Sequence, residues 1–239
     1  MASLQQAAAA LGPWWFRFER DGVSFGGTVE RDREKTEWFF SCLDKLGGEP
    51  ARILELGSHE GSHSLQLARH QAVKQIVALE GRQENLARAA FVKKTFGDDK
   101  ITFRKYDVEG LDPADFDGPF DAVFCAGLLY HVPRPWDLIA RLRGLTRRDL
   151  FLDTHYAAAP EATVEGHAGR WFVEGGDPLS GLSASSFWLT LEDLERTLGE
   201  NGFAVRWLRD LKEARNGPRV FVLARREDRV QTRHGPAGG

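Results

Sequence analysis

The stretch that decides the fold is ARILELGSHEG, residues 51–61. It begins with a short apolar run, residues 52–56, which has the length and the boundaries of a buried strand. The run stops at a turn with a glycine at each end, Gly57 and Gly61, and a helical pattern follows directly. A second apolar run then ends in an acidic residue, Glu80. A strand, a glycine turn, a helix and a strand that ends in an acid together predict a nucleotide-binding βαβ unit.

The spacing of this turn excludes the usual dinucleotide fingerprint. The pattern G-x-G-x-x-G would need glycine at two positions where His59 and Ser62 stand. What remains is an acid, Glu55, before Gly57, and a second glycine at the end of the turn. Such a turn still lets a ligand approach the backbone. It therefore indicates a nucleotide other than NAD.

Apolar runs alternate with helical patterns over most of the chain. We predict strands at 52–56, 75–80, 101–106, 120–125 and 150–154, helices at 62–70, 83–96, 136–143 and 191–200, and two last strands at 203–208 and 219–224. Strands that alternate with helices form a mostly parallel sheet with helices on both faces. Two strands in succession add an antiparallel pair at its edge. The sequence thus predicts an α/β protein with a seven-stranded, mostly parallel sheet.

The remaining segments divide the chain into parts. Residues 1–50 are predicted to form an N-terminal helical cap, and residues 51–227 the main domain. Within that domain, the irregular segment at about 156–187 is expected to be a lid-like insert. Residues 228–239 are polar and rich in glycine and proline, which is typical of a flexible tail.

The composition limits the class of protein. The 239 residues carry a net charge of -3, which gives no global electrostatic reason to bind nucleic acid. No run approaches the roughly 18 apolar residues of a membrane span, and the N-terminus lacks the basic start of a signal peptide. The two cysteines, Cys42 and Cys125, lie far apart in the sequence and suit a reducing compartment. We therefore expect a cytoplasmic protein with no membrane partner.

Further strand ends carry residues that suit a nucleotide ligand. Glu80 ends the second strand, where a carboxylate can accept hydrogen bonds from both hydroxyls of a ribose. Asp107 follows the third strand, and from there a carboxylate can accept a hydrogen bond from the exocyclic amine of adenine. The fourth strand runs into Ala126, Gly127 and Leu128. All these positions belong to the edge at which open α/β sheets bind ligands.

In these features the chain resembles the class I S-adenosylmethionine-dependent methyltransferases, over about residues 52–225. The resemblance implies a Rossmann-like methyltransferase fold and S-adenosyl-L-methionine as the cofactor. It also implies that the glycine turn contacts the methionine part of the donor, the second-strand acid the ribose, and the third-strand acid the adenine. On this basis the expected cofactor-binding residues are Glu55, Gly57, Ser58, His59, Gly61, Glu80, Gly81, Asp107, Val108, Ala126 and Leu128. Many members of the family have glycine where this chain has His59.

A narrower resemblance concerns residues 120–131, FDAVFCAGLLYH, and the last strand. Both are similar to matching regions of the tRNA wobble-uridine carboxymethyltransferases, which use carboxy-S-adenosylmethionine. In that family a tyrosine and an arginine help to hold the extra carboxylate of the donor. The resemblance gives these roles to Tyr130 and Arg219, and a guanidinium can bind a carboxylate bidentately. The alternative function is therefore carboxymethyl transfer to tRNA.

The chain lacks a strongly basic surface, which favours a small-molecule acceptor over tRNA. Transfer to a hydroxyl needs a base that removes a proton. The candidate catalytic residues are His131 and His155, both just past strand ends, because histidine titrates near neutrality. We predict O-methylation by in-line displacement with one of them as the base. The alternative for each histidine is a hydrogen-bonding scaffold role.

The acceptor is expected to be bound by Tyr130, Arg170, Arg219 and Trp15. Arg170 belongs to an aromatic stretch of the insert and Trp15 to an aromatic stretch of the cap, and aromatic side chains commonly line binding sites.

Two further interpretations stay open at this stage. Asp153, His155 and His167 are a candidate metal set, but their spacing is not diagnostic and we expect no metal. A non-catalytic protein that binds the donor and keeps the fold is the alternative from a different class. A homodimer is compatible with every observation above.

Overall fold

Seven strands form one central sheet in the computed structural model, in the order β11-β12-β7-β6-β3-β4-β5. The structure describes residues 3–31, 33–176, 179–212, 214 and 216–227. The parallel strands are β3 (Arg52–Leu56), β4 (Gln75–Glu80), β5 (Ile101–Lys105), β6 (Phe120–Ala126) and β7 (Thr146–His155). The strand β12 (Arg219–Arg226) lies antiparallel between β7 and β11 (Phe203–Leu211). The predicted α/β fold with its antiparallel edge pair is confirmed.

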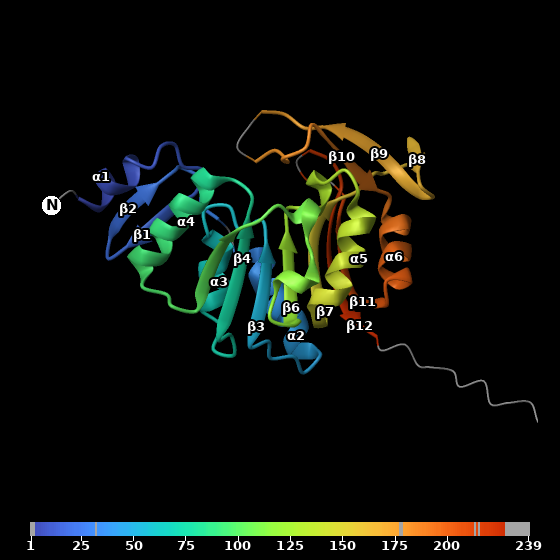
Figure 1. Cartoon of the computed structure of the whole chain (residues 1–239), viewed down its shortest axis with the longest axis horizontal. Coiled ribbons are helices and arrows are strands. Elements are labelled where there is room, and N and C mark those ends of the chain that lie inside the picture. Colours follow the sequence, from blue (N-terminus) through green and yellow to red (C-terminus); the bar gives the residue numbers. More distant parts are fainter. Residues whose placement is uncertain (1–2, 32, 177–178, 213, 215, 228–239) are drawn as a thin grey trace, which may run out of the picture.

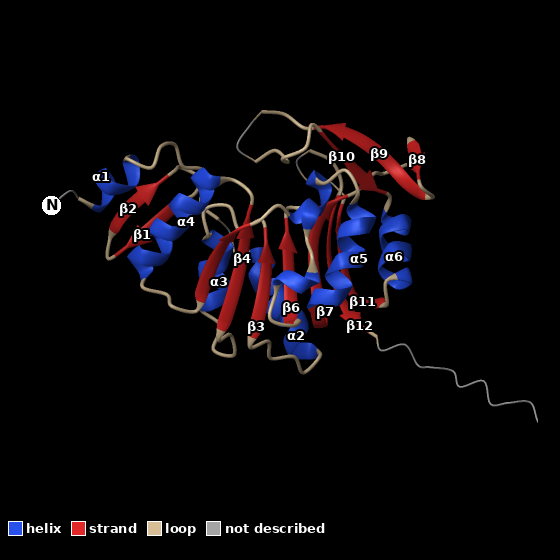
Figure 2. Cartoon of the chain, viewed as in Figure 1, coloured by secondary structure: helices blue, strands red, loops and turns tan. Residues whose placement is uncertain are grey.

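Helices cover both faces of this sheet (Figure 2). On one face α5 (Pro135–Leu145) and α6 (Leu191–Glu200) share a core with the strands. On the other face α2 (Glu34–Lys45), α3 (Ser62–Ala68) and α4 (Gln83–Phe96) pack against them. The strands are apolar at nearly every position because alternate side chains enter the two cores. Cys42 and Cys125 are both buried and free.

The N-terminal segment differs from the helical cap that the sequence predicted. After α1 (Leu4–Ala9) comes an antiparallel hairpin of β1 (Arg17–Arg20) and β2 (Val23–Gly26). Its two-residue turn, Asp21-Gly22, has positive φ angles of 51° and 77°. Aspartate followed by glycine is a strong hairpin signal, because such turns need positive φ at both positions. The prediction overlooked this signal.

The hairpin and α2 have different surroundings. The hairpin packs against α4 (Figure 1), where the ring centres of Phe25 and Phe91 lie 5.7 Å apart. By contrast, Phe39 and Leu43 of α2 are fully buried in the core against the sheet. The helix at 34–45 is therefore an integral layer of the α/β domain and not part of a cap. A domain boundary near residue 50 stays a proposal.

The insert contains a second sheet and is more regular than the sequence predicted. The strands β8 (Ala162–Val164), β9 (His167–Val173) and β10 (Ser185–Leu189) are antiparallel, in the order β10-β9-β8. The turn between β8 and β9 again has positive φ at both residues, Glu165 and Gly166. The strand β8 has only three residues, and β9 and β10 show no clear alternation of polar and apolar residues, so the sequence did not reveal this sheet. Figure 1 shows this sheet, in orange, above the ends of the parallel strands.

Two sequence predictions concern segments beyond this architecture. The predicted tail, residues 228–239, lies outside the described residues. Of the helices that the structure describes, none is both long and apolar enough to cross a lipid bilayer.

Candidate functional site

The turn after β3 has an unusual backbone. Three of its residues have positive φ angles, namely Gly57 at 71°, His59 at 51° and Gly61 at 82°. Glycine is further required at Gly61 because a Cβ atom there would lie 2.8 Å from Cζ of Phe103. Histidine tolerates the left-handed region better than most side chains. His59 can therefore adopt the left-handed backbone conformation at this position of the turn.

Glu80 braces this turn from the end of β4. Its Oε2 accepts a hydrogen bond from the backbone N–H of His59 at 2.8 Å, and its Oε1 accepts one from the N–H of Arg82 at 2.8 Å. The side chain is buried, and Oε1 also accepts a hydrogen bond from Nδ2 of Asn85 at 3.4 Å, whereas Oε2 retains a lone pair for a further donor. Glu80 can therefore fix the turn and still accept a hydrogen bond from a hydroxyl group of a ligand.

Buried polar atoms without a hydrogen-bond partner in the protein gather at the same turn. Among the described residues these atoms include Oε1 of Glu55, Oγ of Ser58 and Nε2 of His63. The other oxygen of Glu55 accepts a hydrogen bond from Ser64 Oγ at 2.5 Å, and burial raises the pKa of Glu55 to about 7. Buried polar groups are nearly always paired in native proteins. These atoms therefore fit a polar ligand bound at the turn.

The other predicted cofactor-binding residues lie at neighbouring strand ends. Leu128 contacts the turn, since a Cβ atom on Gly57 would lie 3.2 Å from Cδ1 of Leu128. Asp107 is exposed and accepts a hydrogen bond from the N–H of Glu109 at 3.0 Å. The remaining residues of this group are Gly81 directly after β4, the buried Val108 behind Asp107, and Ala126 at the end of β6.

A buried ion cluster occupies the end of β7. The carboxylate of Asp153 is fully buried and binds Arg219 of β12 through both oxygens, with Nη2 of Arg219 at 2.6 Å. Lys35 of α2 places its Nζ 2.6 Å from the same carboxylate. Burial by itself would raise the pKa of Asp153, but Lys35 and Arg219 lower it below its usual range. Lys35 was not predicted as a site residue, because a lysine on an amphipathic helix is normally solvated.

Tyr130 and Arg219, which the sequence grouped as substrate-binding residues, do meet in the structure. The Tyr130 hydroxyl is hydrogen-bonded to Arg219, and the guanidinium lies 5.2 Å from the centre of the Tyr130 ring. Burial raises the pKa of Tyr130, so the phenol stays protonated at neutral pH.

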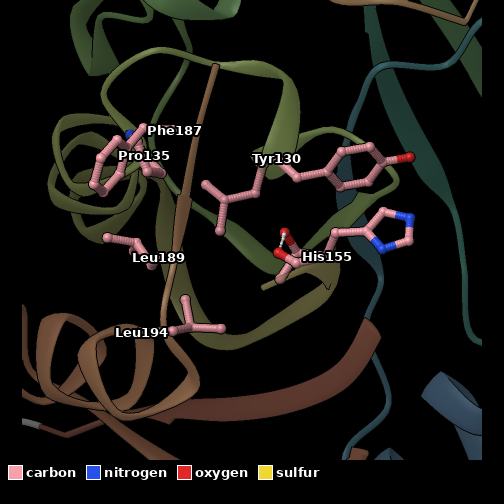
Figure 3. A pocket seen from close by; sticks show the side chains of 8 residues that line it. Tyr130, Pro135, His155, Phe187, Leu189 and Leu194 are labelled. Carbon is pink, nitrogen blue, oxygen red and sulfur yellow. Dashed lines mark hydrogen bonds between the residues drawn. The ribbon is translucent and has the colours of Figure 1, made fainter. Parts of the chain in front are cut away.

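His155 has both of its ring nitrogens engaged. Nδ1 lies 3.0 Å from the carbonyl oxygen of Pro218, and Nε2 lies 3.1 Å from Nη1 of Arg219. Burial, followed by the charge of Arg219, lowers the pKa of His155 to about 4. In Figure 3 the rings of His155 and Tyr130 point to the same side, away from Leu189. This arrangement favours the scaffold role for His155.

His131 has a different environment. Its Nδ1 lies 3.0 Å from both carboxylate oxygens of Glu174, which follows β9 and has a buried side chain. The described residues give Nε2 of His131 no hydrogen-bond partner. Burial lowers the pKa of His131 even though Glu174 acts to raise it, so the imidazole is neutral at neutral pH. Of the two candidate bases, only His131 has a ring nitrogen without a hydrogen-bond partner among the described residues, because both nitrogens of His155 are engaged. Glu174 was not predicted as a site residue.

The last two predicted substrate-binding residues lie apart. The Arg170 guanidinium stacks 4.4 Å from the ring centre of Trp188, which itself stacks on His155. Arg170 therefore belongs to the group around Tyr130. Trp15 instead contacts the glycine turn, where the backbone N–H of Trp15 donates a hydrogen bond to Oε1 of Glu60 at 2.8 Å. The sequence placed Glu60 in the turn but gave it no role.

The candidate metal set does not come together. His167 pairs with Asp193 at 2.9 Å, away from Asp153 and His155. Across the part of the chain that the structure describes, no three His, Cys, Asp or Glu side chains are arranged to hold a metal ion.

Comparisons with known proteins agree with this geometry. A family model described as a methyltransferase domain matches residues 53–149. The N-terminal domain of EvdMO1, crystallised in the presence of SAH and D-fucose, is 34% identical and superimposes with a TM-score of 0.81, covering 94% of this chain and 96% of that domain. The full EvdMO1 structure is longer, and the match covers 47% of it.

Two further relatives are more distant. The tRNA U34 carboxymethyltransferase of Marinobacter nauticus is 28% identical over 167 residues, which is 67% of this chain and 48% of that protein. The chain therefore spans about half the length of this curated relative. The magnesium protoporphyrin IX methyltransferase ChlM from Synechocystis PCC 6803, with bound SAM, is 20% identical, with a TM-score of 0.58 over 82% of this chain and 79% of that one. At this identity the similarity shows the fold alone.

The EvdMO1 domain has also been solved with SAH bound. Its identity over nearly the full length of both chains extends the family assignment beyond the residues that the domain model matches. The chain therefore belongs to the class I S-adenosylmethionine-dependent methyltransferases, with S-adenosylmethionine as its methyl donor.

Proposed function

We propose that this methyltransferase transfers the methyl group to a hydroxyl oxygen of a small molecule, with His131 as the general base. The observation that carries the proposal is the contrast between the two histidines at the strand ends. His131 is neutral and has its Nε2 available, whereas both nitrogens of His155 are engaged. A hydroxyl is the acceptor for which such a base is needed.

The glycine turn and Glu80 would hold the donor. The unpaired atoms of Glu55, Ser58 and His63 fit its methionine part, and the carboxylate of Glu80 fits the ribose hydroxyls. When bound, S-adenosylmethionine supplies an electrophilic methyl group, which an acceptor oxygen attacks as the bond from carbon to sulfur breaks. Nε2 of His131 would take the proton that the hydroxyl loses, and S-adenosylhomocysteine would leave.

A sugar or a similar polyhydroxylated molecule is the acceptor class that we favour. The N-terminal domain of EvdMO1 was crystallised with SAH in the presence of D-fucose, and it is 34% identical to this chain. The half-buried ring of Tyr130 lies 4.1 Å from the His131 ring, and Arg170 offers hydrogen-bond donors nearby. Aromatic faces with a few convergent polar groups are typical of sites for small organic ligands.

The direct test is methyl transfer to a panel of sugars, beginning with D-fucose and related deoxysugars, read as a mass gain of one CH2 group. His131→Asn should lower kcat by about 100-fold or more, because the hydroxyl would lose its base. His70→Asn is the control, since His70 stacks on Phe40 and has no place in the site. Transfer that survives His131→Asn would contradict the assigned base. Methylation of amines alone would contradict the hydroxyl acceptor.

Carboxymethyl transfer is the second candidate, and one observation favours it. Lys35, Tyr130 and Arg219 converge at the end of β7. Lys35 and Arg219 together carry two positive charges, of which Asp153 neutralises one. Against it, Asp153 already binds Arg219 through both oxygens. The two donors can be compared directly by competition for binding. A strong preference for carboxy-S-adenosylmethionine, abolished in Arg219→Ala, would establish this second function in place of the first.

A further inference from the structure

Glu174 is a buried carboxylate that the proposed reaction does not yet use. Its side chain is only 2% exposed. It accepts hydrogen bonds from Nδ1 of His131 at 3.0 Å, from the N–H of Gly181 at 2.7 Å and from Oγ of Ser186 at 2.6 Å. A buried carboxylate requires such partners, because leaving its charge unpaired would be costly. The donors from Gly181 and Ser186 fix the carboxylate, and the carboxylate in turn fixes the imidazole.

We infer that Glu174 is the positioning residue for His131: it keeps the proton on Nδ1 and leaves the Nε2 lone pair for the acceptor hydroxyl. This inference rests on the proposed function, in which His131 is the base. A neutral imidazole carries its proton on one nitrogen and accepts at the other. A carboxylate can only accept, so its contact with Nδ1 selects the tautomer in which Nε2 is unprotonated.

The packing of the insert decides whether this pair forms. Glu174 comes from the insert, whereas His131 follows β6 in the main sheet. A Cβ atom on Gly181 would lie 2.6 Å from the carbonyl oxygen of His131, so only glycine allows this close approach. Phe187 of β10 adds a hydrogen bond from its N–H to the carbonyl oxygen of Val132 at 3.0 Å. The insert therefore contributes directly to the geometry of the base.

The same segment is tied to the donor side of the site. Nη2 of Arg82 donates to the carbonyl oxygens of Ser180 at 2.7 Å and Gly181 at 3.1 Å. The backbone N–H of Arg82 donates to Glu80, the residue assigned to the ribose. One short segment thus connects the edge that would hold the donor with the carboxylate that orients the base.

The charged groups around His131 determine how the pair should titrate. Burial has the largest effect and lowers the pKa of His131, and the cations of Arg219 and Arg82 also lower it. Glu174 is the group that raises this pKa. Removing its charge should therefore lower the pKa of His131 further. The acid limb of the pH profile, where kcat falls because His131 takes up a proton, should then move to lower pH.

The kinetic test compares Glu174→Gln with Glu165→Gln. Glu165 belongs to the same insert but is exposed, where it pairs with Arg134. We expect Glu174→Gln to lower kcat about 10- to 100-fold, to leave the KM for the donor unchanged and to shift the acid limb to lower pH. Glu165→Gln should leave all three quantities unchanged. An unshifted acid limb with full kcat in Glu174→Gln would overturn the inference. If Glu174→Gln does not fold, Ser186→Ala keeps the carboxylate and should give a smaller loss in the same direction.

A second measurement needs no acceptor. Long-range proton–nitrogen NMR of the histidine side chains reports which ring nitrogen carries the proton, and the His131→Asn spectrum assigns the His131 signals. In the unmodified protein His131 should carry its proton on Nδ1, and Glu174→Gln should lose that preference. A proton on Nε2 in the unmodified protein would overturn the inference, even if His131 proves essential. Conversely, a correct tautomer with full activity in His131→Asn would contradict the proposed function and leave the Glu174–His131 pair intact.

Discussion

His131 follows the parallel strand β6 and His155 is the last residue of the parallel strand β7, but their neighbours give them different chemistry. The sequence could identify both because a histidine at the ligand edge of an α/β sheet is a reasonable base. It could not distinguish them, because the deciding partners, Glu174 and Arg219, are distant in the chain. His59 shows the opposite case. Its left-handed backbone follows from its place in the glycine turn, and the turn was recognised from the sequence alone.

The environment of His155 predicts a dependence of stability on pH. In the folded protein His155 stays neutral down to about pH 4, whereas an unfolded histidine takes up a proton near pH ~6.5. Between these values the unfolded state binds the extra proton, so the free energy of unfolding falls as the pH falls. The pKa difference corresponds to roughly 3 kcal/mol.

Urea unfolding at several pH values checks this expectation against His155→Gln, which cannot titrate. The stability advantage of the unmodified protein over the variant should shrink as the solution becomes acidic. Two curves that stay parallel from neutral pH to about pH 4 would show that His155 is not held neutral by the fold.

At the scale of the elements, long periodic segments were predicted well and short ones were not. The helix at 83–96 and the strands at 52–56 and 75–80 have the predicted bounds, because their apolar patterns are continuous. The N-terminal hairpin and the insert sheet were missed. The hairpin strands have only four residues each, the insert strands β9 and β10 show no clear alternation of polar and apolar residues, and both regions depend on the turns at Asp21-Gly22 and Glu165-Gly166. Of the site residues that were overlooked, Glu174 lies in the insert, whereas Lys35 lies on α2 and reaches Asp153 only through the packing of that helix on the sheet.

Glu60 connects the N-terminal segment to the glycine turn. Its carboxylate is buried and accepts hydrogen bonds from the backbone N–H groups of Trp15 and Phe16, both at 2.8 Å. Glu60→Ala would leave two donors without their acceptor, at a cost of about 1–3 kcal/mol each where they stay buried. We therefore expect lower stability and faster amide exchange over residues 14–30.

Hydrogen exchange followed by mass spectrometry measures this effect, with Glu19→Ala as the matched control on the exposed side of the hairpin. Unchanged exchange at Trp15 and Phe16 in a folded Glu60→Ala protein would mean that other contacts hold the segment in place.

At the scale of the whole molecule, the order of the strands brings the functional residues to one edge. The parallel strands β3, β4, β6 and β7 are adjacent, so residues far apart in the sequence follow neighbouring strand ends. This is why acids and glycines after apolar runs were enough to predict the fold and the donor. The acceptor side could not be predicted in the same way, because the insert and β12 complete it through packing.

The most direct test of the account is calorimetric titration with S-adenosylhomocysteine of the unmodified protein, Glu80→Ala and the control Glu84→Ala, whose side chain is exposed on α4. The buried Glu80 is assigned both to the turn and to the ribose, so Glu80→Ala should weaken binding by about 10- to 100-fold while circular dichroism shows a folded protein. Glu84→Ala should bind as the unmodified protein does. Equal affinity in all three proteins would contradict the placement of the donor at this edge of the sheet.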